Sequence, residues 1–308
     1  MAVADIVKEP ESDETGFASL FVTAQDGLRL HVRRYGEPGR GLPIVCLPGL
    51  TRNGADFHEL ATALTRDAGQ PRLVITIDSR GRGYSDHDPN PDNYSFPVEL
   101  ADVIAVITAL EIGAAIFLGT SRGGILTMLL GAARPTAIAG AILNDIGPVI
   151  DVKGLVRIKG YAGKLPTPRS YQEGAEILRR LGDAQFPGLP PASWLGQAKQ
   201  IWRQKGGAMV LAYDTNLAKT LENIGVEHRP PALWAQFDSL ARVPLMVIRG
   251  ANSDILSVAT LDAMRERRLD IDVLEVPNQG HAPLLAEPEV IARIAAFVTL
   301  CDVSTLGF

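Results

Sequence analysis

Cysteine, runs of positive charge and long apolar stretches are all scarce in this 308-residue sequence. Only Cys46 and Cys301 are present, far apart, so the sequence indicates neither a disulfide framework nor a CxxC metal site. The formal net charge is −5 and no segment is rich in lysine and arginine, which argues against binding to the phosphate backbone of nucleic acids. The most apolar region, residues 103–118, contains Glu111 and is too short to span a bilayer.

The first 16 residues are acidic and show no periodicity, which predicts a loose tail. A secretory signal would instead need a basic start followed by an apolar stretch. Together with the scarcity of cysteine, this predicts a cytoplasmic protein with reduced thiols that associates with neither a membrane nor nucleic acid.

After the tail, short apolar runs alternate with helical patterns. Residues 19–24 and 28–35 predict two strands joined by a turn at Asp26-Gly27. Further runs without polar alternation are typical of parallel strands buried on both faces; they cover residues 43–47, 73–77, 115–118, 141–143, 245–248 and 273–276. Helical patterns cover residues 55–66, 98–110, 125–133, 258–267 and 288–299. The order predicts an α/β fold: a mostly parallel sheet flanked by helices and entered through an antiparallel hairpin.

One region interrupts this alternation. Residues 146–236 contain no strand pattern but many glycines and prolines, patches of helical pattern and all three tryptophans, Trp194, Trp202 and Trp234. We interpret it as a helical cap inserted into a core made of residues 17–145 and 237–308. The aromatic side chains favour an apolar roof over a pocket; an enlarged helix layer of the core is the alternative.

Residues 119–123 form a G-x-S-x-G sequence with Ser121 at its centre. The apolar run at 115–118 precedes it and a helical pattern follows, which is the context that a nucleophilic serine on a tight strand–helix turn requires. The alternative is a Gly/Ser helix cap such as phosphate-binding folds use.

A serine hydroxyl needs a base, and His281 is the only one of the five histidines that follows the last predicted strands. The histidine in turn needs a carboxylate to hold its ring. Asp254, after the run at 245–248, is the predicted acid; Asp145, after the run at 141–143, is the alternative.

The anionic oxygen formed during acyl transfer needs two backbone N–H donors. Arg122, directly after the serine, supplies one. The turn after residues 43–47 supplies the other: Pro48 has no N–H and Gly49 permits close approach, so the amide of Leu50 is the candidate. An ordinary strand–helix turn is the alternative reading of this segment.

With these segments in place, the sequence resembles the α/β-hydrolase superfamily over nearly all of residues 17–300. Residues 78–86 are similar to that family's Asp-x-Arg-Gly-x-Gly-x-Ser segment, and residues 278–283 to its terminal histidine segment. The resemblance implies a helical cap after the sixth strand, and a serine at position 121 favours the esterase, lactonase and C–C hydrolase branches. Pro48 and Arg122 depart from the usual residues. The Arg122 guanidinium either pairs with a carboxylate or leans into the pocket.

The resulting hypothesis is a serine hydrolase that cleaves a small, largely apolar carboxylic ester or lactone through an acyl-enzyme. No complete nucleotide-binding motif is present, so no cofactor or metal is expected, and a small-molecule substrate is the expected partner. C–C bond hydrolysis of ring-cleavage diketones and acyl transfer would use the same residues. A non-catalytic binding or sensor protein on this scaffold is a third alternative.

Overall fold

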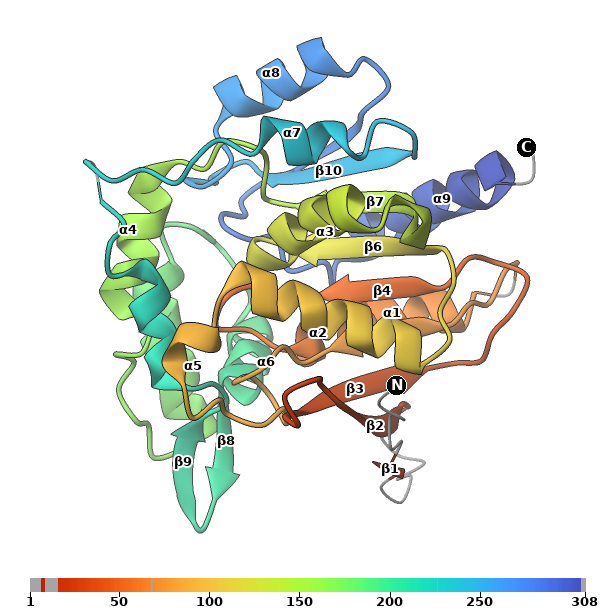
Figure 1. The fold of residues 1–308 in the computed structure, drawn as a ribbon. Helices are drawn as coiled ribbons and strands as arrows, with labels where there is room; N and C mark the ends of the chain where they lie inside the picture. The colour runs from red at the N-terminus through yellow and green to blue at the C-terminus, as the bar shows by residue number, and fades with distance from the viewer. Residues whose placement is uncertain (1–6, 9–15, 68, 226, 306–308) are drawn as a thin grey trace.

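The computed structural model describes residues 7–8, 16–67, 69–225 and 227–305. Within these ranges nine strands form one sheet in the spatial order β1-β2-β3-β5-β4-β6-β7-β10-β11 (Figure 1). The strands are Val7–Lys8 (β1), Ala18–Thr23 (β2), Arg29–Tyr35 (β3), Ile44–Leu47 (β4), Val74–Ile77 (β5), Ala115–Thr120 (β6), Ile138–Asn144 (β7), Leu245–Gly250 (β10) and Asp272–Val276 (β11). In this spatial order, the neighbouring strands from β1 through β3 to β5 pair antiparallel. From β5 through β4 to β11 the neighbouring strands pair parallel. The predicted α/β fold is confirmed.

The predicted loose tail at residues 1–16 lies outside the described residues, except for β1 and Gly16. The two residues of β1 pair with β2 at the edge of the sheet.

The central strands lack polar alternation because both faces of the sheet are covered. Every residue of β4, β5 and β7 is buried. Along β4, Val45 and Leu47 belong to one core cluster, whereas Ile44 and Cys46 belong to another on the opposite face. Successive side chains of a strand point to opposite faces, so each strand contributes to two hydrophobic layers.

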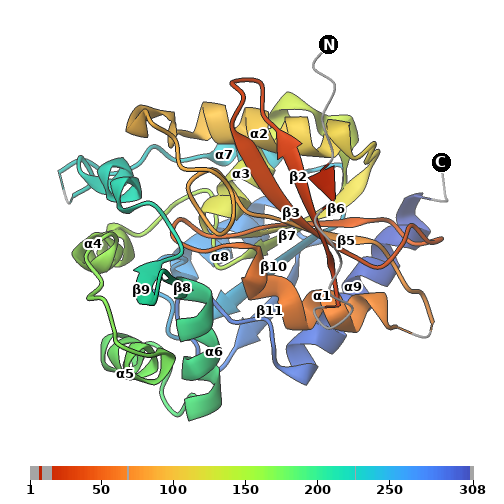
Figure 2. The ribbon, with the colours of Figure 1, turned by 90° about the horizontal axis from the view of Figure 1, so that it is seen from below.

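Helices form those two layers. Phe96–Ala109 (α2), Arg122–Ala133 (α3), Trp234–Asp238 (α7) and Val258–Arg267 (α8) cover one face, and His58–Thr65 (α1) and Pro288–Thr305 (α9) cover the other (Figures 1 and 2). Short 3-10 turns occupy Gly54–Phe57 (η1), Pro91–Asn93 (η2) and Pro135–Ala137 (η3). The helical patterns in the sequence located these core helices except α7.

The chain between β7 and β10 extends beyond the carboxyl ends of the parallel strands, at the left of Figure 1. It contains Val152–Tyr161 (α4), Tyr171–Gly182 (α5), Pro191–Ile201 (α6) and Thr215–Leu221 (η4). It also contains an antiparallel pair, Trp202–Lys205 (β8) and Ala208–Leu211 (β9), so the expectation of a region without strands is wrong. A separate hydrophobic cluster around Trp194 and Trp202 joins α5, α6, β8, β9 and η4, whereas Ile158 of α4 packs with the core cluster. We call the region from α4 to η4 the cap.

Trp234 is not part of the cap cluster. It lies at the start of α7, packs against the core and stacks edge-on against Phe237 with ring centroids 5.8 Å apart. The chain has therefore returned to the core by α7, slightly before the predicted boundary at residue 236.

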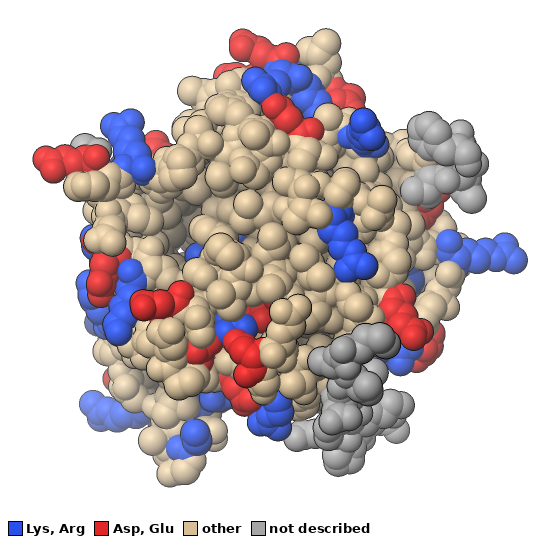
Figure 3. All heavy atoms as spheres, viewed as in Figure 1, with Lys and Arg blue, Asp and Glu red and all other residues tan. Residues whose placement is uncertain are grey.

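Two observations concern the apolar length of the helices and the distribution of charge on one face. No helix in the described ranges is both long and apolar enough to cross a bilayer. On the face drawn in Figure 3, basic and acidic side chains are scattered and intermixed.

Candidate active site

Ser121 lies at the apex of the tight turn between β6 and α3. Its backbone angles are φ +52° and ψ −115°, in a region that residues with side chains rarely adopt. A Cβ added at Gly119 would lie 2.4 Å from the backbone of Gly123, and one added at Gly123 would lie 2.0 Å from the carbonyl oxygen of Leu47. The glycines on either side of Ser121 are therefore required because backbone segments meet here at distances that exclude a side chain.

His281 reaches Ser121 from the loop after β11. Its Nε2 lies 2.8 Å from Ser121 Oγ, and its Nδ1 lies 2.7 Å from a carboxylate oxygen of Asp145. A carboxylate oxygen accepts this hydrogen bond, so Nδ1 carries the ring proton and donates a hydrogen bond to Asp145. Nε2 is then left to accept the hydroxyl proton of Ser121. The imidazole is only 7% exposed, which shields both hydrogen bonds from bulk water.

The carboxylate beside His281 belongs to Asp145, and the prediction of Asp254 for this place is wrong. Asp145 follows directly after β7, which lies between β6, the strand that carries Ser121, and β10. It is fully buried, and its oxygens also accept hydrogen bonds from Gly250 N at 2.9 Å and Ser253 Oγ at 2.5 Å. These contacts hold the carboxylate in one orientation against the imidazole.

Asp254 has a different partner, Arg157 of the cap helix α4. Its two oxygens accept from Arg157 Nε at 2.7 Å and Nη2 at 2.8 Å. Burial opposes ionisation of Asp254, but the hydrogen bonds and charge of Arg157 outweigh it and hold the pKa of that carboxyl below its usual value. The Asp254 carbonyl also accepts from Gly154 N at 3.0 Å, so this loop anchors α4 of the cap to the core.

Two residues that the sequence analysis did not single out hold the histidine segment, and one of them, Asn144, also contacts the serine segment. Asn144 donates from Nδ2 to Thr120 Oγ1 at 3.0 Å and to the backbone carbonyl of Pro283 at 3.1 Å. The backbone carbonyl of Asn144 accepts from Ser121 N. Gln185, from the cap, accepts from His281 N at 3.1 Å. A polar residue ending a wholly apolar strand was the available signal for Asn144; no comparable signal marked Gln185.

The two turns predicted to supply backbone N–H donors are linked through one buried carboxylate, Glu99 of α2. Glu99 Oε2 accepts from Arg122 Nε at 2.7 Å, and Oε1 accepts from Arg82 Nη1 at 2.7 Å. Arg82 Nε in turn donates to the carbonyl of Leu50 at 2.7 Å. The Arg122 guanidinium also lies over the ring of Phe96, at 4.1 Å from its centroid. Of the two alternatives for this side chain, pairing with a carboxylate is correct.

Glu99 is ionised despite being only 1% exposed. Burial alone would raise its pKa, but the charges of Arg82 and Arg122 and their hydrogen bonds hold that pKa below its usual value. The network fixes the positions of the Leu50 turn and the start of α3 relative to each other.

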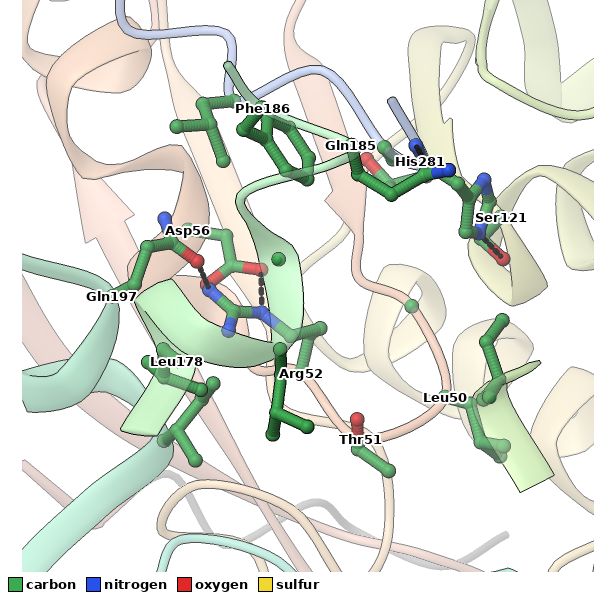
Figure 4. A pocket seen from close by; sticks show the side chains of 18 of the residues that line it. Leu50, Thr51, Arg52, Asp56, Ser121, Leu178, Gln185, Phe186, Gln197 and His281 are labelled. Atoms are coloured by element: carbon green, nitrogen blue, oxygen red, sulfur yellow. Dashed lines mark hydrogen bonds and ion pairs between the residues drawn. The ribbon is translucent and has the colours of Figure 1, made fainter. Parts of the chain in front are cut away.

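A cavity of about 200 Å³ lies between the core and the cap, bordered by Ser121 and His281. Most of its wall is apolar, including Leu50, Phe57, Ile158, Leu178, Phe186 and Trp194. Arg52, Asp56 and Gln197 form a polar patch on the wall, opposite Ser121 and His281 in Figure 4. Of the three tryptophans only Trp194 lines this cavity, since Trp202 is completely buried within the cap. In the described part of the chain, no group of three or more His, Cys, Asp and Glu side chains is arranged to hold a metal ion.

Comparisons with known proteins agree with this architecture. Residues 44–294 match the model of the alpha/beta hydrolase family. The chain is 38% identical to an alpha/beta hydrolase from Novosphingobium aromaticivorans whose crystal structure superimposes with a TM-score of 0.85, covering 92% of this chain and 99% of that one. The chain therefore belongs to the alpha/beta hydrolase family, as the resemblance predicted, and it is a hydrolase.

Two relatives of named activity extend the comparison. The chain is 32% identical over 280 residues to the 3-hydroxybutyrate-oligomer hydrolase of Cupriavidus necator, covering 88% of this chain and 93% of that protein. It is 25% identical over 268 residues to the 2-(acetamidomethylene)succinate hydrolase of Mesorhizobium japonicum, covering 86% of this chain and 90% of that protein.

Proposed function

We propose that this hydrolase cleaves a small, largely apolar carboxylic ester or lactone through an acyl-enzyme intermediate. Ser121 is the nucleophile, His281 the general base and Asp145 the carboxylate that holds the imidazole. The observation that carries the proposal is the hydrogen-bonded series from Asp145 through His281 to Ser121, with distances of 2.7 and 2.8 Å. Its two ends are fixed by the strand–helix turn and by the buried environment of Asp145.

The reaction runs in two halves. As Ser121 Oγ attacks the carbonyl carbon, His281 Nε2 takes the hydroxyl proton, and the imidazolium is stabilised by Asp145. The backbone N–H groups of Leu50 and Arg122 bind the anionic oxygen of the tetrahedral intermediate. His281 then gives its proton to the leaving alcohol. In the second half it takes a proton from the attacking water and passes it to Ser121 Oγ as the bond to the acyl group breaks and the carboxylic acid is released.

The cavity supports a small substrate with an apolar acyl or alcohol group, because most of its wall is hydrocarbon. The name of the Cupriavidus necator relative gives a 3-hydroxybutyrate oligomer as the substrate of that protein. We include short hydroxy-acid esters in the proposed substrate class for this reason.

Replacement of Ser121 tests the proposal. The wild-type protein is expected to hydrolyse 4-nitrophenyl butyrate, and Ser121→Ala is expected to lose turnover by at least about 10³-fold while remaining folded. Ser304→Ala, a matched change on the exposed side of α9, is the control and keeps wild-type turnover. Full activity of Ser121→Ala would contradict the assignment.

The same residues would serve C–C bond hydrolysis or acyl transfer, so a substrate panel is needed to separate the reactions. We expect nitrophenyl esters and lactones to be turned over faster than vinylogous diketones, and water to outcompete added alcohols as acceptor. Faster cleavage of a diketone would replace ester hydrolysis as the proposed reaction. A chain that turned over none of these compounds would favour the non-catalytic alternative.

A further inference from the structure

Arg52 lies on the wall of the substrate cavity, on the side opposite the proposed nucleophile (Figure 4). It follows the turn that contains Leu50, and it flanks Gly49 together with Ser121. A Cβ added at Gly49 would lie 3.6 Å from Arg52 Cγ and 3.7 Å from Ser121 Cβ. Gly49 therefore separates Arg52 from Ser121, and the Arg52 side chain extends along the cavity wall toward the cap helix α6, where its guanidinium meets Gln197 and Gln200 (Figure 4).

Hydrogen bonds use only part of the guanidinium. Nε donates to Asp56 Oδ2 at 2.7 Å. Nη2 has three acceptors, each at 2.7 Å, that share its two hydrogens: Asp56 Oδ1 and the side-chain oxygens of Gln197 and Gln200. A guanidinium carries five N–H donors, two of them on Nη1. Nη1 makes no hydrogen bond to any residue in the described ranges, and in Figure 4 the dashed lines reach only the other two nitrogens.

Arg52 Nη1 is available to a ligand because no acceptor in the described ranges engages it. The cavity wall also contains apolar and aromatic side chains, among them Phe57, Trp194 and Ile201, together with Tyr161 and Tyr213, whose hydroxyls feel the charge of Arg52. Asp56 already compensates the positive charge, and the two side chains are each 19% exposed. The pair therefore offers a fixed, directed donor for an oxygen atom rather than an uncompensated positive charge.

We propose that Arg52 Nη1 binds a second acceptor oxygen of the substrate, located beyond the ester that Ser121 attacks. This inference rests on the proposed ester hydrolysis. The substrate class is thereby narrowed to esters whose acyl or alcohol part carries a further ester carbonyl or a carboxylate. Asp56, Gln197 and Gln200 hold the guanidinium in place for this contact, and the apolar wall accommodates the carbon chain between the two oxygens.

The experiment compares matched 4-nitrophenyl esters. One series has a plain alkyl acyl chain from butyrate to hexanoate, and two series of the same lengths end in a methyl ester or in a free carboxylate. The quantity measured is the ratio of kcat/KM for an oxygen-bearing ester to kcat/KM for its alkyl counterpart. Arg52→Gln is expected to lower that ratio by roughly 10- to 100-fold at the chain length that fits best, as expected for loss of a hydrogen bond to a charged donor.

Two further variants separate substrate binding from structure. Arg52→Gln combined with Asp56→Asn avoids an unpaired carboxylate in the cavity and is expected to show the same fall in the ratio. Arg180→Gln, on the exposed side of α5, is the matched control and leaves the ratio at its wild-type value. The two oxygen-bearing series show whether a neutral carbonyl or a carboxylate is preferred.

The outcomes distinguish this subsite from the reaction itself. Equal losses on alkyl and oxygen-bearing esters in both Arg52 variants would overturn the subsite and leave ester hydrolysis intact. Absence of turnover of every ester by the wild-type protein would overturn the proposed function, and this subsite with it.

Discussion

Replacing Asp145 and Asp254 in turn by asparagine separates two carboxylates that both follow strands of the sheet. Asp145 accepts directly from His281 Nδ1 and has no exposure to solvent. Asparagine keeps its shape but removes the charge that fixes the tautomer and stabilises the imidazolium. The corresponding change in a serine protease lowers kcat by about 10⁴-fold, equivalent to about 5.4 kcal/mol of transition-state stabilisation. We expect Asp145→Asn to lose about this much.

Asp254 acts on His281 only through its charge, because both of its oxygens are bound by Arg157. Asp254→Asn is therefore expected to lower kcat by about tenfold at most, since it leaves the hydrogen bond to His281 intact and changes only a screened charge interaction. The double variant Asp254→Asn with Arg157→Gln restores charge balance and is expected to recover part of that loss.

The assay is the kcat for 4-nitrophenyl butyrate under saturating substrate at slightly alkaline pH. Circular dichroism and a melting curve for each variant confirm that the fold is retained. A loss for Asp254→Asn that equalled or exceeded the loss for Asp145→Asn would refute the assignment of Asp145, and the sequence-based choice of Asp254 would be restored.

Three further predictions address the surroundings of this centre. Glu99→Gln leaves two buried arginines without the carboxylate that links the two turns carrying the backbone donors. We expect kcat to fall about tenfold with little change in KM, because these donors act mainly on the transition state. Steady-state kinetics with an unchanged kcat would contradict this prediction. Gly123→Ala places a carbon 2.0 Å from the carbonyl of Leu47, and urea denaturation is expected to show a loss of about 3 kcal/mol in the free energy of unfolding; wild-type stability would show that the turn can relax. The lowered pKa of Asp254 stabilises the fold above the unfolded-state pKa of about 3.9, and this contribution is lost as pH falls through the folded pKa. Melting temperatures of the wild type should thus drop more steeply below pH 4 than those of Arg157→Gln, and parallel curves would argue against the ion pair.

The strands of the sheet could be predicted from the sequence because burial on both faces leaves a simple pattern. The runs at 43–47 and 73–77 contain no polar alternation, and the structure buries all of β4 and β5. The turn at Ser121 was equally accessible because its G-x-S-x-G pattern stands between an apolar run and a helical pattern, although the contact that excludes a side chain at Gly123 comes from Leu47 of β4. Both features leave a recognisable pattern in the local sequence.

The β8–β9 pair had a signal that the cap interpretation overlooked. Gly206 and Gly207 link the two strands, and both have positive φ angles, +59° and +80°. A Gly-Gly pair between short strands is a known signal for a two-residue hairpin turn. β8, with the sequence WRQK, is too polar to stand out by hydrophobicity, whereas the apolar run AMVL of β9 was a second signal.

The acid partner of His281 could not be chosen from the chain order, because Asp145 and Asp254 both lie between the serine and the histidine. The choice depends on a long-range contact. Arg157 of the cap binds Asp254, whereas Asp145 lies at the end of the strand next to that of Ser121. Neither the pairing across the cap nor the order of strands in space can be read from local periodicity.

The most direct test of the central claim is to locate the covalent adduct that a fluorophosphonate forms with this protein. Mass spectrometry of the wild-type chain is predicted to show one added phosphonyl group, confined to the peptide that contains Ser121. His281→Ala should react at least about 10³-fold more slowly, because the hydroxyl is then without its base. An adduct on another residue, or equal labelling rates with and without His281, would contradict the account.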